Sequence, residues 1–185
     1  MSAQPPWAEA TRLLDFWRAA GKRGAWFSKD PGFDRDFRAG FLELHLAAAR
    51  GACEGWAARP EGALALLVLL DQFPRNAFRG TPHMYATDPA ARRHARAAEA
   101  RGDMAAVAPE LRLFFALPFA HSEEIADQDL SVALNRRLGQ PWLVHAQGHR
   151  DIIRRFGRFP HRNPILGRET TPEEADFLRK GGFSG

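Results

Sequence analysis

The chain carries helix-forming residues along almost its whole length, and this feature constrains its fold more than any other. Alanine, leucine, arginine and glutamate fill most segments, β-branched residues are few, and no Asn-Gly or Asp-Gly dipeptide marks a hairpin turn. Apolar residues recur at three- and four-residue spacing, as in Phe37, Phe41, Leu44 and Ala48, which is the period of an amphipathic helix. The sequence therefore predicts an all-α protein.

Glycines and prolines divide the chain into about eight expected helices. The segment 60–72 is apolar all round, which predicts a helix that is buried at the centre of the fold and ended by Pro74. Asp88 is expected to cap the helix that follows. The next helix is expected to run from Asp103 into Pro118.

Paired helices with short turns are expected in the second half of the chain. Ser122 is expected to cap a helix that buries Ile125, and residues 141–156 are expected to form its antiparallel partner. Thr171 and Glu174 have the spacing of a capping box at the start of the last helix. Consecutive hairpins of this kind predict a stack like that of tetratricopeptide repeats.

The composition is that of a globular domain, with 45% apolar and 26% charged residues. No linker divides the chain, so we expect a single domain over residues 1–185. The longest apolar run, 63–70, is far shorter than the roughly 20 residues that cross a bilayer, and no secretory signal is recognisable. We therefore expect a cytoplasmic protein without a membrane partner. Cys53 is the single cysteine, which excludes an intramolecular disulfide.

Positive charge is concentrated in one segment. The chain has a formal net charge of +4. Between His145 and Arg162 five arginines stand against Asp151 alone, so this segment has the same net charge as the whole chain. Such a segment attracts anionic partners, whether phosphate, carboxylate or the backbone of a nucleic acid. Alternatively, it is a solvated helix face with scattered ion pairs.

Three short segments carry polar residues that the fold does not obviously require. The first contains Asp71, Arg75 and Asn76, directly after the buried run. A carboxylate at the end of an apolar helix needs a cationic partner, and Arg75 is the nearest one. This pair is either part of a binding site or a buried ion pair that holds the loop.

The second segment, 118–124, contains His121, Ser122 and Glu123 at an expected helix start, where free backbone N–H groups favour anions. Helix capping explains Ser122 and Glu123, but helix initiation does not need the imidazole of His121.

The third segment contains His145, His149, His161, Arg162 and Asn163. His145 and His149 are four residues apart, so a helix places both on one face, which is also a geometry of metal ligands. The glutamate of the H-E-x-x-H motif is missing between them, so no hydrolytic signature is present.

The chain resembles the bacterial domain-of-unknown-function family numbered 924. The stretches that carry the resemblance are Leu70-Asp71-Gln72-Phe73-Pro74-Arg75-Asn76, Phe114-Phe115 with Pro118 and His121-Ser122-Glu123, and Arg155-Phe156-Gly157-Arg158-Phe159-Pro160-His161-Arg162-Asn163. The resemblance implies an all-α repeat fold of tetratricopeptide type and a cytoplasmic protein. It implies no activity, cofactor or substrate.

Our leading hypothesis is a binding protein for a small anionic ligand that carries phosphate or carboxylate. Arg75 and Arg162 would hold the anion, Asn76 and Asn163 would orient it, and Asp71 would fix the arginines. The expected pocket residues are Asp71, Arg75, Asn76, His121, Glu123, His149, His161, Arg162 and Asn163.

Three alternatives use other chemistry. An enzyme would employ His121 or His149 as general base and Glu123 to orient it. We expect no metal, but a metal-dependent version would recruit His145, His149 and a carboxylate. A nucleic-acid-binding protein would use the basic segment 145–162, and a protein-binding module would present an apolar groove. The sequence names no cofactor.

Overall fold

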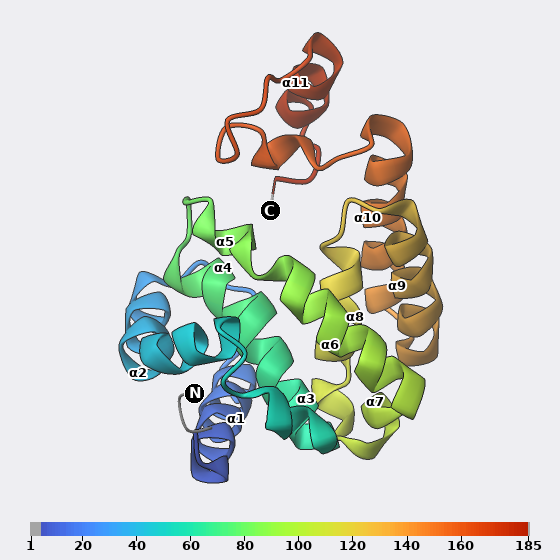
Figure 1. Ribbon diagram of the computed structural model, residues 1–185. Helices are drawn as coiled ribbons and strands as arrows, with labels where there is room; N and C mark the ends of the chain where they lie inside the picture. Colours follow the sequence, from blue (N-terminus) through green and yellow to red (C-terminus); the bar gives the residue numbers. More distant parts are fainter. Residues whose placement is uncertain (1–4, 185) are drawn as a thin grey trace. The chain divides into compact units, whose positions relative to one another are not determined.

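The computed structural model describes residues 5–184 and shows only helices, turns and loops over this range, which confirms the predicted all-α fold (Figure 1). Eight of the α-helices in these residues are eight or more residues long, and this number agrees with the prediction of about eight helices. They are α1 (Trp7–Lys22), α2 (Pro31–Ala49), α3 (Pro60–Leu67), α6 (Asp88–Arg101), α8 (Leu113–Ala120), α9 (Ile125–Leu138), α10 (Trp142–Phe156) and α11 (Pro172–Arg179).

Shorter elements connect these helices. Three are single α-helical turns or little more, namely α4 (Phe73–Ala77), α5 (His83–Ala86) and α7 (Asp103–Ala106). Three are 3₁₀ turns, namely η1 (Glu54–Ala58), η3 (Pro109–Leu111) and η4 (Pro160–Arg162), and η2 (Val68–Gln72) is a π-helix.

The chain forms two compact units. The first contains the described residues up to Arg79 together with His83–Pro118. The second contains Gly80–Pro82 and the described residues from Phe119 onward. The single domain over residues 1–185 and the tetratricopeptide-like stacking of its hairpins stay predictions.

The apolar segment 60–72 lies in the core of the first unit, as predicted. Every residue from Gly62 to Gln72 is buried, and α3 packs against α1, α6 and η1. Glycine is required at position 62, because a Cβ atom there would lie 1.9 Å from the carbonyl oxygen of Trp56. The central helix is therefore in direct contact with the backbone of η1.

The prediction that Pro74 ends this helix is wrong. The helix widens into the π-helix η2 at Val68 and continues as α4 to Ala77, with Pro74 in the first turn of α4. A proline lacks the N–H group that a continuous helix would use, but side chains from elsewhere satisfy the carbonyl oxygens that lose a donor. The helical path can therefore continue past the proline.

Two further boundaries differ from the predictions. The expected helix from Asp103 to Pro118 is divided into α7, η3 and α8, because Pro109 starts a new turn, and Pro118 lies inside α8. Asp88 is the first residue of α6 rather than its N-cap, and its carboxylate accepts hydrogen bonds from Arg75.

The second unit is built on the hairpin of α9 and α10, which lie side by side (Figure 1). Ser122 does not cap α9 as predicted, since the N-cap is Glu124 and the Ser122 hydroxyl accepts from the N–H of that residue. Ile125 was expected to be buried but is 42% exposed at the start of α9. The capping box of Thr171 and Glu174 is present at the start of α11, as predicted.

Candidate functional site

The predicted site residues fall into two sets, one in each unit. Asp71, Arg75 and Asn76 lie in the first unit, and the other six lie in the second.

Arg75 is engaged by two buried carboxylates of the first unit. Its guanidinium donates to both carboxylate oxygens of Asp88 over 2.8 and 2.9 Å and lies 3.2 Å from a carboxylate oxygen of Asp71. Burial alone would lower the pKa of Arg75, but the charges of Asp71 and Asp88 outweigh it and raise that pKa. An anion at Arg75 would compete with both carboxylates, so the geometry favours the buried ion pair over an anion site.

Asn76 also has structural partners. Its amide nitrogen donates to the carbonyl oxygen of Gln72 over 2.9 Å, and its amide oxygen accepts from Arg79 over 3.1 Å. Arg79 continues to Asp34 through two hydrogen bonds of 2.8 and 3.0 Å. Asn76 therefore satisfies a backbone carbonyl oxygen near the end of α4, as polar side chains at helix ends commonly do.

Sequence reasoning missed a histidine pair in the first unit, in which His45 is buried and His83 is half-buried. The Nδ1 atom of His45 lies 2.8 Å from the carbonyl oxygen of Leu69, and its Nε2 lies 3.0 Å from Nε2 of His83. Burial is the main cause that lowers the pKa of His45, and His83 adds to it. The neutral ring must donate at Nδ1, because a carbonyl oxygen only accepts, so His83 donates to the bare Nε2 of His45. The available signal was a histidine one residue after Leu44 on the apolar face of its helix.

In the second unit, predicted site residues from separate segments do come together. The ring of Phe159 lies 5.6 Å, between ring centroids, from both His149 of α10 and His161 of η4. The guanidinium of Arg162 lies 4.6 Å above the same ring, and its Nη2 donates to the carbonyl oxygen of His121 over 2.8 Å. We call His121, His149, His161 and Arg162 the histidine–arginine cluster.

His149 lies in the most perturbed environment of this cluster. Burial is the largest cause that lowers its pKa to about 3, and His121, Arg162, His145 and His161 lower it further through their charges. The Nδ1 atom of His149 is buried and has no hydrogen-bond partner within residues 5–184. A buried polar atom without a partner is rare in proteins and calls for a ligand, an ion or water.

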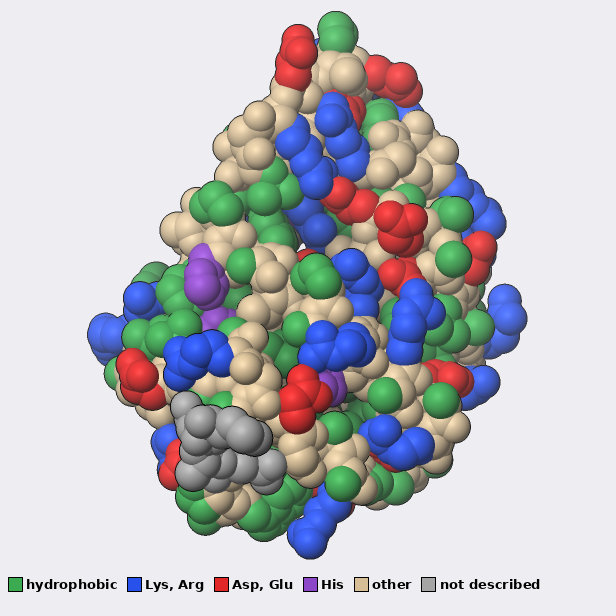
Figure 2. Space-filling model, viewed as in Figure 1, with side chains coloured by type: hydrophobic (Ala, Val, Ile, Leu, Met, Phe, Trp, Pro, Cys, Tyr) green, Lys and Arg blue, Asp and Glu red, His purple; other side chains and the backbone are tan. Residues whose placement is uncertain are grey.

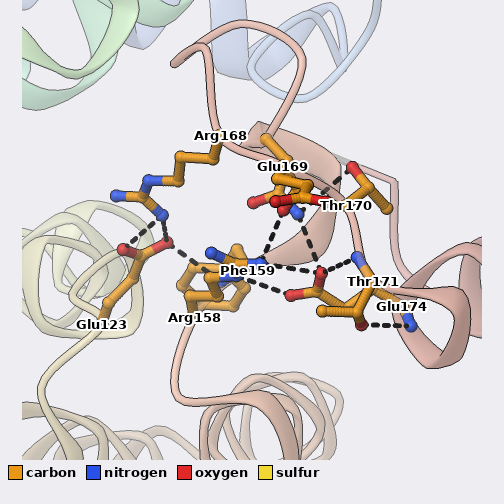
Figure 3. Close-up of polar contacts among 9 residues, drawn as sticks. Glu123, Arg158, Phe159, Arg168, Glu169, Thr170, Thr171 and Glu174 are labelled. Carbon is orange, nitrogen blue, oxygen red and sulfur yellow. Dashed lines mark hydrogen bonds and ion pairs between the residues drawn. The ribbon is translucent and has the colours of Figure 1, made fainter.

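Glu123 positions the loop that carries the cluster. Its carboxylate accepts from the backbone N–H of Phe159 and from Arg168, both over 2.9 Å. Glu123 and Glu174 reach residues 158–159 from opposite sides (Figure 3). These contacts give Glu123 a structural role that links two distant parts of the chain, whereas the sequence explained it by local helix capping. Its role as orienter of a histidine, in the enzyme alternative, stays a prediction.

Asn163 belongs to the same structural network through Glu174. Its amide nitrogen donates to Glu174 over 3.1 Å, and Arg158 donates to both oxygens of that carboxylate over 2.6 and 2.9 Å. The hydrogen bond from Arg158 is the largest cause that lowers the pKa of Glu174 to about 2. The loop 158–163 is therefore anchored to α11, which fixes His161 and Arg162.

Most other arginines of the basic segment 145–162 have acidic partners. Arg150 and Arg154 both contact Asp129, and Arg155 contacts Glu173. Acidic and basic side chains are interspersed on the face shown in Figure 2. This pairing supports the solvated helix face and gives the nucleic-acid hypothesis little support.

Within residues 5–184, no three His, Cys, Asp or Glu side chains are placed to share a metal ion. His145 is exposed one turn before His149, with its ring centroid 6.3 Å from that of Trp142. Over the same residues, none of the helices combines the length and the apolar character needed to cross a bilayer.

The family model for bacterial proteins of unknown function, DUF924, matches residues 13–182. The chain belongs to this family. It is also similar to a solved protein of unknown function from Agrobacterium tumefaciens, with 55% identity, a TM-score of 0.91, and coverage of 94% of this chain and 98% of the other. No curated protein matches the chain. The DUF924 relatives are described as proteins of unknown function, so they indicate no activity for this chain. Its function has to be inferred from the geometry of the candidate site.

Proposed function

We propose that the second unit binds a small anion, carrying phosphate or carboxylate, at the histidine–arginine cluster. The observation that carries the proposal is the buried Nδ1 atom of His149, which has no partner within the described residues and is surrounded by basic side chains. An anion would supply acceptor oxygens to the guanidinium of Arg162 and to the N–H groups of the imidazoles.

The cluster has the chemistry that recognition of an anion needs. A guanidinium binds phosphate or carboxylate bidentately, and an imidazole can donate a hydrogen bond from either nitrogen. Arg162 is held at His121 and over Phe159, and the anchors at Glu123 and Glu174 fix its loop. A site held in this way loses little entropy when a ligand binds.

The acid–base properties favour binding over general-base catalysis. A general base works best when its pKa lies near the working pH. With a pKa of about 3, His149 is neutral but weakly basic at pH 7. The same imidazole remains a good hydrogen-bond partner, so ligand binding is the function that the cluster supports best.

Titration with inorganic phosphate and with succinate, followed by isothermal calorimetry and by the histidine ring signals in NMR spectra, tests the proposal. We expect saturable binding in the unsubstituted protein. The affinity should fall about tenfold in His149→Gln and in Arg162→Gln, which corresponds to a loss of about 1.4 kcal/mol in binding free energy. Matched controls are His83→Gln in the first unit and Arg155→Gln, whose side chain is exposed on α10. The proposal is wrong if neither anion saturates the protein or if the controls weaken binding equally.

A further inference from the structure

An exposed phenylalanine lies against the histidine–arginine cluster. The ring of Phe183 is 43% exposed, and its centroid lies 4.6 Å from that of His149 and 5.1 Å from that of His161. Both imidazoles meet it at steep angles, 67° and 84°, so neither ring is stacked flat on it. Phe183 thus adds a partly open aromatic surface beside the proposed anion site.

The backbone holds Phe183 in this position. After α11 the chain turns at Gly181, which has a φ of +84°, and Gly182 donates to the carbonyl oxygen of Phe177 over 2.9 Å. A Cβ atom on Gly182 would lie 2.5 Å from the Phe177 ring, so only glycine fits this close turn. The turn directs the following residue back to α10 and η4, where its ring contacts His149 and His161.

Aromatic surface also lies beneath the cationic group of the cluster. Phe159 is buried, and the guanidinium of Arg162 lies 4.6 Å from the centroid of its ring. The cluster therefore places groups that recognise an anion next to groups that stack on flat rings. An inorganic ion would use only the first kind of group.

From this arrangement we infer that the ligand of the cluster carries its phosphate or carboxylate on a planar aromatic ring system that packs against Phe183. This inference rests on the proposed anion site and narrows its ligand class. Flat rings stack on exposed aromatic side chains with little dependence on the substituents of the ring. The ring of the ligand would therefore contribute affinity, and its anionic group would set the orientation of the ligand in the site.

Two pairs of probes separate the ring from the anion. AMP is compared with ribose 5-phosphate, which lacks the base, and benzoate is compared with cyclohexanecarboxylate, which has a similar size but no flat ring. If the inference holds, the aromatic member of at least one pair binds about tenfold more tightly, and the phosphate and carboxylate pairs show which anion the site prefers.

The variant Phe183→Leu tests the role of the ring, because leucine keeps apolar bulk without an aromatic face. We expect the affinity ratio within the preferred pair to fall from about ten to about one. Phe27→Leu changes an exposed phenylalanine of the first unit, and the ratio should remain at about ten.

Three outcomes contradict the inference in different ways. Equal affinities within both pairs in the unsubstituted protein show that the ring is not recognised, although the anion site stands. If Phe183→Leu strengthens binding of both members of a pair equally, Phe183 is a cover over the site and not a stacking surface. If none of the four probes saturates the protein, the proposed anion site itself is wrong.

Discussion

The Nδ1–H of His45 takes the place of a backbone donor at the carbonyl oxygen of Leu69, over 2.8 Å. In the π-helix η2, the N–H of Phe73 donates to the carbonyl oxygen of Val68, five residues earlier. In the same register residue 74 would serve Leu69, but residue 74 is proline and has no N–H. Thr87 donates in a similar way to the carbonyl oxygen of Leu70 over 2.6 Å. The side chains of His45 in α2 and of Thr87, the residue before α6, therefore satisfy two backbone carbonyl groups of the π-helix η2.

Replacing His45 by leucine should destabilise the protein by about 1–3 kcal/mol, because the carbonyl oxygen of Leu69 would be buried without a donor. The His45→Asn variant keeps an amide nitrogen near the position of Nδ1 and should lose less stability. Urea unfolding of both variants, followed by circular dichroism, measures the difference. Equal losses would mean that the packing of the ring, and not its hydrogen bond to Leu69, stabilises this part of the core.

Glu173 and Glu174 are adjacent residues of the same type with very different surroundings. Glu174 is buried and accepts from Arg158, Asn163 and the backbone of Thr171, whereas Glu173 is exposed and contacts Arg155 on the surface. Glu174→Gln should cost about 1–3 kcal/mol, because a buried charged hydrogen-bond network loses its charge. Glu173→Gln, the matched control, should change stability by less than about 0.5 kcal/mol.

The pH dependence of the Glu174 variant gives a second readout. The pKa of Glu174 falls from 4.5 to about 2 in the folded protein, so this carboxylate stabilises the fold above about pH 4.5. That contribution is lost as the pH falls through about 2. Unfolding measured between pH 7 and pH 3 should therefore show a smaller acid-induced loss for Glu174→Gln than for the unsubstituted protein. Parallel curves for the two proteins would contradict the role given to Glu174.

The features that the sequence predicted correctly depend on local patterns. The capping box of Thr171 and Glu174 needs residues only three positions apart, and the buried segment 60–72 is apolar in every direction. Such features follow from helix periodicity and from the chemistry of helix ends.

The features that the sequence could not predict depend on partners far along the chain. Pro74 was expected to end a helix, but the side chains of His45 and Thr87, 24 and 17 residues from the carbonyl oxygens that they satisfy, allow the helix to continue. Glu123 was explained by helix capping, and in the enzyme alternative it oriented a histidine, but its carboxylate accepts from the backbone N–H of Phe159, 36 residues away. In both cases the local pattern was ambiguous, and tertiary hydrogen bonds decided the outcome.

The protonation of His149 links stability to pH with a definite sign. In the folded protein the pKa of His149 is about 3, below its ordinary value of 6.5, mainly because the half-buried ring is largely withdrawn from water. Between these two pH values the unfolded chain binds more protons at this residue than the folded chain does. The folded state should therefore lose stability as the pH falls from about 6.5 towards about 3, by at most about 1.4 kcal/mol per pH unit from this group.

An NMR titration of the histidine ring signals between pH 8 and pH 5 tests the lowered pKa of His149 directly. The signal of His149, assigned by its absence in His149→Gln, should not move over that range, because the ring stays neutral until the protein approaches its folded-state pKa. With saturating phosphate the His149 signal should begin to move at a higher pH, because a bound anion favours the protonated ring and raises the pKa of His149. A signal that titrates near pH 6.5 without ligand would show that the ring is open to water and that its buried Nδ1 is not poised for a ligand.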